Sequence, residues 1–305
     1  MQPNSQGVPT LLVTGSNGQV GFELRRSLAP LGRVIALDRA GCDLSRPDAL
    51  RGVLREWRPD VIVNAAAYTA VDKAEGDVDA AFAINAVAPG VLAEEARAAG
   101  SLLVHYSTDY VFDGCKPDPY VEADAVNPQS VYGQSKLAGE QAIEAAGATA
   151  LVLRTCWVAG AHGGNFAKTM LKLGRERDTL RVIADQFGAP TTASLIADVT
   201  AQIVSRHWLQ GRRESFPAGV YHLAAGGETT WHGYATEVLK TAAARGIELK
   251  VDPASIEAIP TSAYPLPAPR PANSRLDTRK LRETFGIYLP DWREGTHLLL
   301  DQILS

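Results

Sequence analysis

The chain has 305 residues, of which 46% are hydrophobic and 21% are charged, and its formal net charge is −4 at pH 7. This composition is ordinary for a globular protein, and without a block of like charges it argues against nucleic acid and a polybasic membrane patch as partners. No apolar run approaches the roughly 20 residues that span a bilayer. The three cysteines, Cys42, Cys115 and Cys156, are widely spaced, as expected for free thiols in a reducing cytoplasm.

The N-terminal half alternates short apolar segments with helical patterns. Residues 1–9 lack the basic and apolar regions of a secretory signal, so we expect a short disordered extension. The predicted strands are 10–15, 33–38, 61–67, 102–108 and 150–155, and the predicted helices are 20–31, 47–56 with Ser45 as its cap, 78–99 and one that starts near Tyr132. Strands that are apolar throughout indicate a parallel sheet buried between helices. The sequence therefore predicts an α/β fold with a Rossmann-like, doubly wound parallel sheet over residues 10–155.

The pattern changes after residue 155. Further helices are predicted at 166–175, 193–208, 231–245 and 278–285, and further strands at 220–225 and 248–252. The segment 259–277 holds five prolines and is predicted to be a packed loop, because proline excludes regular structure. We expect residues 156–305 to form mainly a smaller C-terminal α/β substrate-binding subdomain, with segments of about 180–225 returning to the Rossmann domain.

A glycine-rich loop follows the first strand. TGSNGQVG places Gly15, Gly18 and Gly21 between that strand and the first helix. Glycine there lets the backbone turn tightly and approach a pyrophosphate that faces the helix N-terminus. The spacing G-x-x-G-x-x-G indicates a dinucleotide-binding loop.

The end of the second strand predicts an adenosine contact. Asp38 can accept hydrogen bonds from the ribose and would repel a 2′-phosphate, whereas Arg39 beside it could attract one. The residues therefore leave NADPH and NADH both open as the cofactor. Asp43 follows nearby, with adenine binding and a turn or capping role about equally supported.

A tyrosine and a lysine stand four residues apart in VYGQSKLAGE. On a helix, Tyr132 and Lys136 share one face, about 6 Å apart along the axis. Such pairs are common on solvated surfaces. At that distance and an effective dielectric near 20, however, an ammonium favours a phenolate by about 2–3 kcal/mol, on the order of two pKa units. Beside a cofactor loop, the pair indicates a phenol made acidic for proton transfer.

These motifs resemble the extended short-chain dehydrogenase/reductase family. TGSNGQVG, the NAAA at 64–67, STDYVFDG at 107–114 and the Tyr132-x-x-x-Lys136 pair carry the resemblance. More specific segments, AAYTAVDKAE (66–75), DQFGAPT (185–191) and TSAYPLPAPRPANSRLD (261–277), are similar to the dTDP-4-dehydrorhamnose reductase family over roughly residues 10–304. The resemblance implies NAD(P)H-dependent reduction, at C4, of a dTDP-linked 4-keto-6-deoxy sugar, the last step of dTDP-L-rhamnose synthesis for cell-surface polysaccharides such as O-antigen.

The resemblance also implies roles for individual residues. Thr108, Tyr132 and Lys136 would be catalytic. The cofactor would be bound by Gly15, Gly18, Gln19, Val20, Gly21, Asp38, Asp43, Leu44, Ala67, Tyr68, Thr69, Tyr106, Tyr132 and Lys136. The sugar nucleotide would contact Thr108, Asp109, Trp157, Asn165 and Arg270. For Asn165 and Arg270 the expectation is a diphosphate, held by helix N-terminal amides and a cation, although Arg270 is as readily a surface arginine.

Two neighbouring positions bear on the chemistry. Ser107 competes with Thr108 for the hydroxyl role. Related enzymes place this hydroxyl three residues before the valine of a Val-aromatic pair, which Val111-Phe112 matches for Thr108, and Ser107 would then point to the other face of the strand. Tyr110 stands where related sugar-nucleotide 4,6-dehydratases have a glutamate base, which favours simple ketone reduction over dehydration. Reduction of another keto sugar nucleotide and a non-catalytic NADP-binding regulatory subunit are the alternatives. The histidines lack metal spacing, and His105 and His222 fall in apparent strands, where we expect packing roles.

Some members of the family dimerise through magnesium held by glutamates. Glu23 matches one such position, but Ser194 and Gln302 fall at the other two and are poor magnesium ligands. The sequence therefore predicts no metal, and a monomer or weak homodimer.

Overall fold

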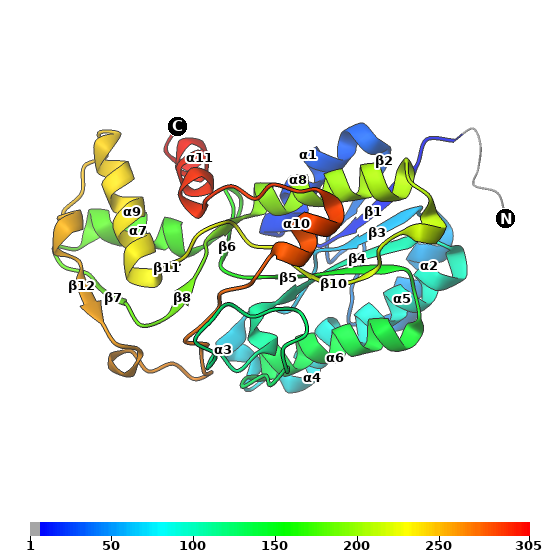
Figure 1. Cartoon of the computed structure of the whole chain (residues 1–305), viewed down its shortest axis with the longest axis horizontal. Coiled ribbons are helices and arrows are strands. Elements are labelled where there is room, and N and C mark those ends of the chain that lie inside the picture. Colours follow the sequence, from blue (N-terminus) through cyan, green and yellow to red (C-terminus); the bar gives the residue numbers. More distant parts are fainter. Residues whose placement is uncertain (1–6) are drawn as a thin grey trace.

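A parallel sheet of six strands forms the centre of the molecule. The computed structural model describes residues 7–305 (Figure 1), so most of the expected disordered extension over 1–9 lies outside the described residues. The strands are β1 (Thr10–Thr14), β2 (Arg33–Leu37), β3 (Val61–Asn64), β4 (Leu102–Thr108), β5 (Ala150–Thr155) and β10 (Gly219–His222), in the spatial order β10-β5-β4-β3-β1-β2. Every residue of β3, β4 and β5 is buried, as the apolar pattern predicted. The Rossmann-like, doubly wound fold is confirmed.

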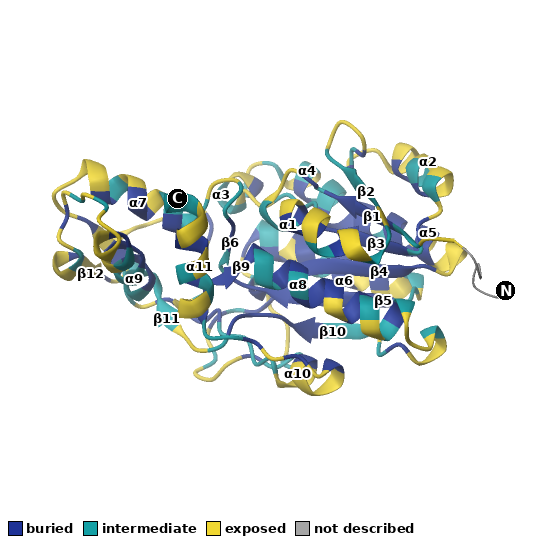
Figure 2. Ribbon diagram, turned by 90° about the horizontal axis from the view of Figure 1, so that it is seen from above, coloured by how far each residue is buried: buried dark blue, intermediate teal, exposed yellow. Residues whose placement is uncertain are grey.

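Helices cover both faces of this sheet (Figure 1), and the strands between them are largely buried (Figure 2). One face carries α1 (Gln19–Leu28), α8 (Ala193–Ile203) and α10 (Arg279–Phe285), and the other carries α2 (Pro47–Trp57), α5 (Ala88–Ala99) and α6 (Val131–Ala146). Each face has its own apolar core. Among residues 7–305, no helix combines the length and apolar character needed to cross a bilayer.

A smaller lobe holds a third apolar core. Its main helices are α7 (Phe166–Glu176), α9 (Trp231–Ala244) and α11 (Trp292–Leu304), seen at the left of Figure 1. Its short strands are β6 (Val158–Ala159), β7 (Arg181–Ile183), β8 (Phe187–Gly188), β9 (Thr191–Thr192), β11 (Thr229–Thr230) and β12 (Glu257–Ile259). Between these elements the chain returns to the large sheet through α8 and β10, because α8 packs on α1 and β10 pairs with β5.

Short helical segments complete the fold. They are η1 (Ala29–Leu31), α3 (Val71–Ala74), α4 (Val78–Phe82), η2 (Ala83–Val87), η3 (Asp109–Val111), η4 (Val204–Leu209), η5 (Arg213–Ser215), η6 (Pro253–Ser255) and η7 (Thr261–Ala263).

Two local predictions were wrong. The segment 248–252 is not a strand, because the amides of Lys250 and Val251 donate to the Gly174 carbonyl at the end of α7 rather than to a neighbouring strand. Ser45 does not cap α2, whose N-cap residue is Arg46. The Ser45 amide and hydroxyl instead donate to Asp43.

The predicted helix over 78–99 is interrupted by a π-helical segment, η2. Pro89 has no N–H to offer the carbonyl of Asn85, and a proline ring clashes with the carbonyl four residues back. The helix widens there, and the freed Asn85 carbonyl lies so close to α6 that a Cβ on Gly139 would approach it to 2.1 Å. The Asn85 side chain reaches the loop after β3, where it pairs with both the N–H and the C=O of Tyr68.

A buried ion pair ties α6 to β5. Glu140 and Arg154 are 6% and 5% exposed and meet at 2.6 Å. We expect Glu140→Gln to cost about 3–5 kcal/mol of unfolding free energy, because it leaves the guanidinium buried without its counter-charge. The double variant Glu140→Gln/Arg154→Met should recover most of that loss in urea unfolding. The exposed Glu144→Gln on the same helix is the control, and an equal loss there would contradict the assignment.

Candidate active site

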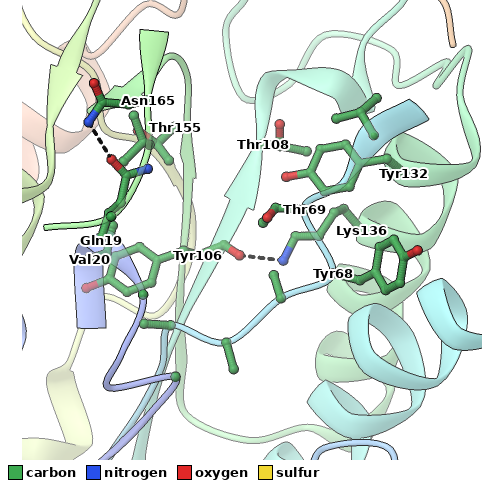
Figure 3. Close-up of a pocket in the computed structure, with 18 of the residues that line it drawn as sticks. Gln19, Val20, Tyr68, Thr69, Tyr106, Thr108, Tyr132, Lys136, Thr155 and Asn165 are labelled. Atoms are coloured by element: carbon green, nitrogen blue, oxygen red, sulfur yellow. Dashed lines mark hydrogen bonds between the residues drawn. The ribbon is translucent and has the colours of Figure 1, made fainter. Parts of the chain in front are cut away.

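A cavity of about 1000 Å³ opens at the carboxyl edge of the sheet. It begins where the strand order reverses between β1 and β3 and extends between the two lobes to α9 (Figure 3). Ligands of doubly wound sheets bind at such switch points. All of the predicted site residues line this cavity except Gly21 and Arg270.

The glycine loop forms the cavity wall at the start of α1. Gly15 has φ of 68°, and a Cβ there would lie 2.7 Å from the backbone of Ala66. A Cβ on Gly21 would lie 2.1 Å from the Gly15 carbonyl oxygen, so Gly21 lets the helix pack on the loop although it stays outside the cavity. Gly18 is the N-cap residue of α1, and no side chain caps the helix. The uncapped start of α1 therefore lies at the cavity, a position that fits a dinucleotide pyrophosphate.

Asp38 closes the far side of this wall. Its carboxylate accepts hydrogen bonds from the amides of Ala40 and Gly41 and from the side chain of Asn17, which fix its position. Asp43 accepts from Ser45 and holds a turn, although it also lines the cavity next to Leu44.

Lys136 is buried in the cavity wall. Its Nζ atom donates to the Tyr106 carbonyl at 2.6 Å and lies 3.1 Å from Nε2 of His105. Burial lowers the pKa of Lys136 to about 8, opposed by the charge of Glu140. An ammonium has three donors, so with two engaged one remains for Tyr132 or a ligand hydroxyl.

Tyr132 stands on the same face of α6, with Thr108 beside its hydroxyl (Figure 3). Burial raises the pKa of Tyr132 to about 12, while the hydrogen bond with Thr108 acts in the opposite direction. The expected lowering of this pKa by Lys136 is not seen. Desolvation of the phenolate is the largest effect, and the ammonium is directed to Tyr106 and His105. Ser107 also contributes to the lining, and its hydroxyl has no partner among residues 7–305.

The loop after β3 forms a further part of the cavity wall. Ala67, Tyr68 and Thr69 line the cavity there, held by the Asn85 side chain, which also donates to Ser135 of α6. The Tyr68 hydroxyl donates to Asp77, which does not line the cavity.

Asp109 lies at the floor of the cavity and is 3% exposed. Burial raises the pKa of its carboxyl to about 6. Interactions with Ser274 and Thr108 oppose this rise. Oδ1 accepts from Thr108, and Oδ2 makes no hydrogen bond within the described part of the chain. An orphaned buried oxygen that lines a cavity is suited to a ligand hydroxyl.

The end of the cavity in the small lobe is aromatic. The indole of Trp157 stacks on that of Trp231 with ring centroids 3.7 Å apart, and Phe166 and Tyr234 continue the surface. Trp157 has φ of 46°, a left-handed conformation in which a bulky residue is strained, so the surrounding contacts must hold it there.

The two residues predicted to contact a phosphate, Asn165 and Arg270, already have protein partners in the structure. Asn165 is the N-cap residue of α7, and its Oδ1 accepts from the Lys168 amide. Its Nδ2 donates to the Gly160 carbonyl and to the side chain of Gln19. Arg270 lies outside the cavity lining, because Asp72 of α3 binds its guanidinium at 2.6 Å.

Some cavity residues had no usable signal in the sequence. Trp231 and Tyr234 read as part of an amphipathic helix, and Thr155 as the end of a strand. His105 was expected only to pack, yet its ring contacts Lys136. Its place beside a lysine in the following helix depends on how β4 and α6 pack, and no spacing along the chain encodes that.

A doubly wound sheet with a glycine loop at its switch point and a tyrosine–lysine pair in the same cavity defines an oxidoreductase of the short-chain dehydrogenase/reductase class. The family described as "RmlD substrate binding domain" matches residues 9–305. A dTDP-4-dehydrorhamnose reductase of Burkholderia thailandensis is 50% identical over 97% of this chain and 99% of its own length. The chain belongs to the dTDP-4-dehydrorhamnose reductase family.

Solved structures agree with this assignment. A dTDP-4-dehydrorhamnose reductase from Clostridium acetobutylicum is 36% identical and superimposes with a TM-score of 0.88, covering 97% of this chain and all of that one. A second, from Bacillus anthracis in complex with NADP, is 32% identical with a TM-score of 0.86, covering 97% of this chain and 99% of that one.

Gly188 supports the placement of Trp157. A Cβ on Gly188 would lie 2.6 Å from the indole, so we expect Gly188→Ala to displace Trp157 from Trp231. Overpacking should cost about 1–3 kcal/mol, and the exciton signal of the stacked indoles in circular dichroism should largely disappear. Gly52→Ala, where the space is open, should preserve the signal. An intact signal in Gly188→Ala would contradict the assignment.

Proposed function

We propose that this protein reduces the C4 ketone of dTDP-4-dehydro-6-deoxy-L-mannose to dTDP-L-rhamnose with NADPH or NADH. Thr108, Tyr132 and Lys136 meet in one cavity wall beside the glycine loop, and this juxtaposition is the observation that carries the proposal. The B. anthracis relative binds NADP. The names of the relatives supply the sugar nucleotide.

The residues of this chain fit a nicotinamide dinucleotide. The glycine loop and uncapped start of α1 would hold the pyrophosphate, with Gln19 and Val20 beside it, and Asp38 would accept from the adenosine ribose. The bound cofactor supplies the hydride. The remaining donor of Lys136 would bind the nicotinamide ribose.

Tyr132 acts as the proton donor. With its pKa at about 12 it holds its proton at neutral pH. An alkoxide is a stronger base than a phenolate, so proton transfer to the reduced C4 oxygen runs downhill. Thr108 hydrogen-bonds the same oxygen and orients the carbonyl. The orphaned oxygen of Asp109 and the indole of Trp157 would contact the sugar.

Removal of the donor tests this role. We expect Tyr132→Phe to lower kcat by about 10²–10⁴, the usual size of a general-acid contribution, with little change in the dissociation constant for NADPH. Consumption of NADPH and NADH with the dTDP-4-keto sugar measures both. Tyr221→Phe, which loses a buried hydroxyl remote from the cavity, is the control. Unchanged turnover in Tyr132→Phe would sink the assignment.

The same assay separates the alternatives. Turnover only with another 4-keto sugar nucleotide would redefine the substrate. Tight cofactor binding without turnover on any of them would indicate a regulatory subunit.

The lowered pKa of Lys136 predicts a loss of activity at alkaline pH. Its pKa is lowered to about 8, so it is charged below that pH and neutral above it. We expect kcat/KM for NADPH to fall as pH rises through about 8, because kcat/KM reports the free enzyme. Circular dichroism over the same range controls for unfolding. A profile that stays flat to about pH 10 would show that the ammonium is not required.

A further inference from the structure

A chain of buried polar side chains crosses the sheet to Lys136. Thr14 of β1 lies 2.6 Å from Asn64 of β3, Asn64 lies 3.0 Å from Nδ1 of His105 on β4, and Nε2 of His105 lies 3.1 Å from Nζ of Lys136. All four residues are at most 2% exposed. The strand register places Thr14 opposite Asn64 and Asn64 opposite His105, so the chain is built into the sheet.

The donors and acceptors of this chain constrain one another. An ammonium only donates, so Nε2 of His105 must accept from charged Lys136, and the single ring proton then sits on Nδ1. In the structure, Nδ2 of Asn64 faces Nδ1 of His105, and Oδ1 of Asn64 accepts from the Thr14 hydroxyl. A ring proton on Nδ1 needs an acceptor, so this tautomer requires the Asn64 amide to turn over, with its oxygen toward the ring and its nitrogen toward Thr14. The two ends of a side-chain amide exchange by rotation, so no backbone movement is needed.

The imidazole is held neutral. Burial and the nearby charge of Lys136 both lower the pKa of His105 well below its ordinary value. A protonated ring would present a second donor to the ammonium and leave both groups unsatisfied. A neutral ring satisfies both.

We infer that His105 is a positioning residue, whose neutral imidazole, fixed as the Nδ1–H tautomer by Asn64 and Thr14, accepts a hydrogen bond from Lys136 and keeps it charged and aimed at the cavity. Charge-assisted bonds are roughly twice as strong as neutral ones. Loss of this acceptor therefore disfavours the charged lysine more than the neutral one. The role in turnover rests on the proposed function, whereas the tautomer and the lysine charge do not.

Other titratable groups surround Lys136. The elements packed against α6 include β4, η3, η2, α3, α4 and α5. Besides His105, the titratable side chains of these elements and of α6 itself are Tyr106, Asp109, Tyr110, Asp72, Lys73, Asp79, Glu94, Glu95, Arg97, Tyr132, Glu140 and Glu144. Of these, Glu140 raises the pKa of Lys136, and its charge is shared with Arg154. His105 is the one that contacts Nζ through its side chain within the described residues.

The tautomer is observable directly in the full-length protein, with and without NADPH. Nitrogen-15 histidine NMR distinguishes protonated Nδ1 from protonated Nε2, and the signal that disappears in His105→Gln assigns the ring. We expect one neutral ring with protonated Nδ1 at neutral pH that does not titrate down to about pH 5.5, well below an ordinary histidine. Protonated Nε2 at neutral pH, or titration with an ordinary pKa, would overturn the inference.

Variants test the effect on Lys136. His105→Leu removes the acceptor and should move the alkaline limb of NADPH affinity, followed by cofactor fluorescence, down by about one pH unit, a tenfold change in proton affinity. His105→Gln carries an acceptor near the position of Nε2 and should restore most of the limb. His222→Gln, at a buried histidine of β10 remote from Lys136, should leave it in place.

If the alkaline limb of NADPH affinity does not move in His105→Leu, or is not restored in His105→Gln, His105 does not position Lys136. Because affinity is read without turnover, absence of reductase activity would count against the proposed function alone. If His105→Leu does not fold, the NMR measurement on the unaltered chain still decides the tautomer.

Discussion

The parallel order of the six central strands is the constraint on which the rest of the structure depends. Parallel strands end at one edge, so the glycine loop after β1, the loop after β3 and the Thr108–Asp109 segment after β4 converge there. The reversal between β1 and β3 opens a crevice at that edge, and α6 supplies Tyr132 and Lys136 to its wall. The strand order therefore brings together, at one edge of the sheet, segments that are far apart in the chain.

Burial then sets the chemistry of the cavity. Desolvation disfavours every charged form, so it raises the pKa of Tyr132 and Asp109 and lowers that of Lys136. At neutral pH, Tyr132 therefore keeps its proton, and the pKa of Lys136 lies only about one unit above that pH. Hydrogen bonds act against desolvation. Tyr106 accepts from the Lys136 ammonium and His105 contacts it, and the hydrogen bond with Thr108 lowers the pKa of Tyr132.

The two lobes are joined around the cavity by a few polar contacts. Gln19 of the glycine loop accepts from the Gly160 amide and the Asn165 side chain. This side chain therefore links the glycine loop to the small lobe. On the other side, Asp72 holds the proline-rich segment through Arg270 and the Ala268 amide. Both sets of contacts therefore join segments that are far apart in the chain.

The sequence by itself determined the main strands and helices of the Rossmann-like sheet, the glycine loop and the Tyr132–Lys136 pair, because apolar periodicity, glycine spacing and an i, i+4 interval are local properties of the chain. Only the tertiary structure decided what each side chain contacts. It paired Arg270 with Asp72 and stacked Trp157 on Trp231. It also set the pKa of Tyr132 against the direction that spacing implied, since desolvation depends on everything packed around a group and a sequence interval measures only one neighbour. His105 shows the same division: its strand could be read from the sequence, and its contact with Lys136 could not.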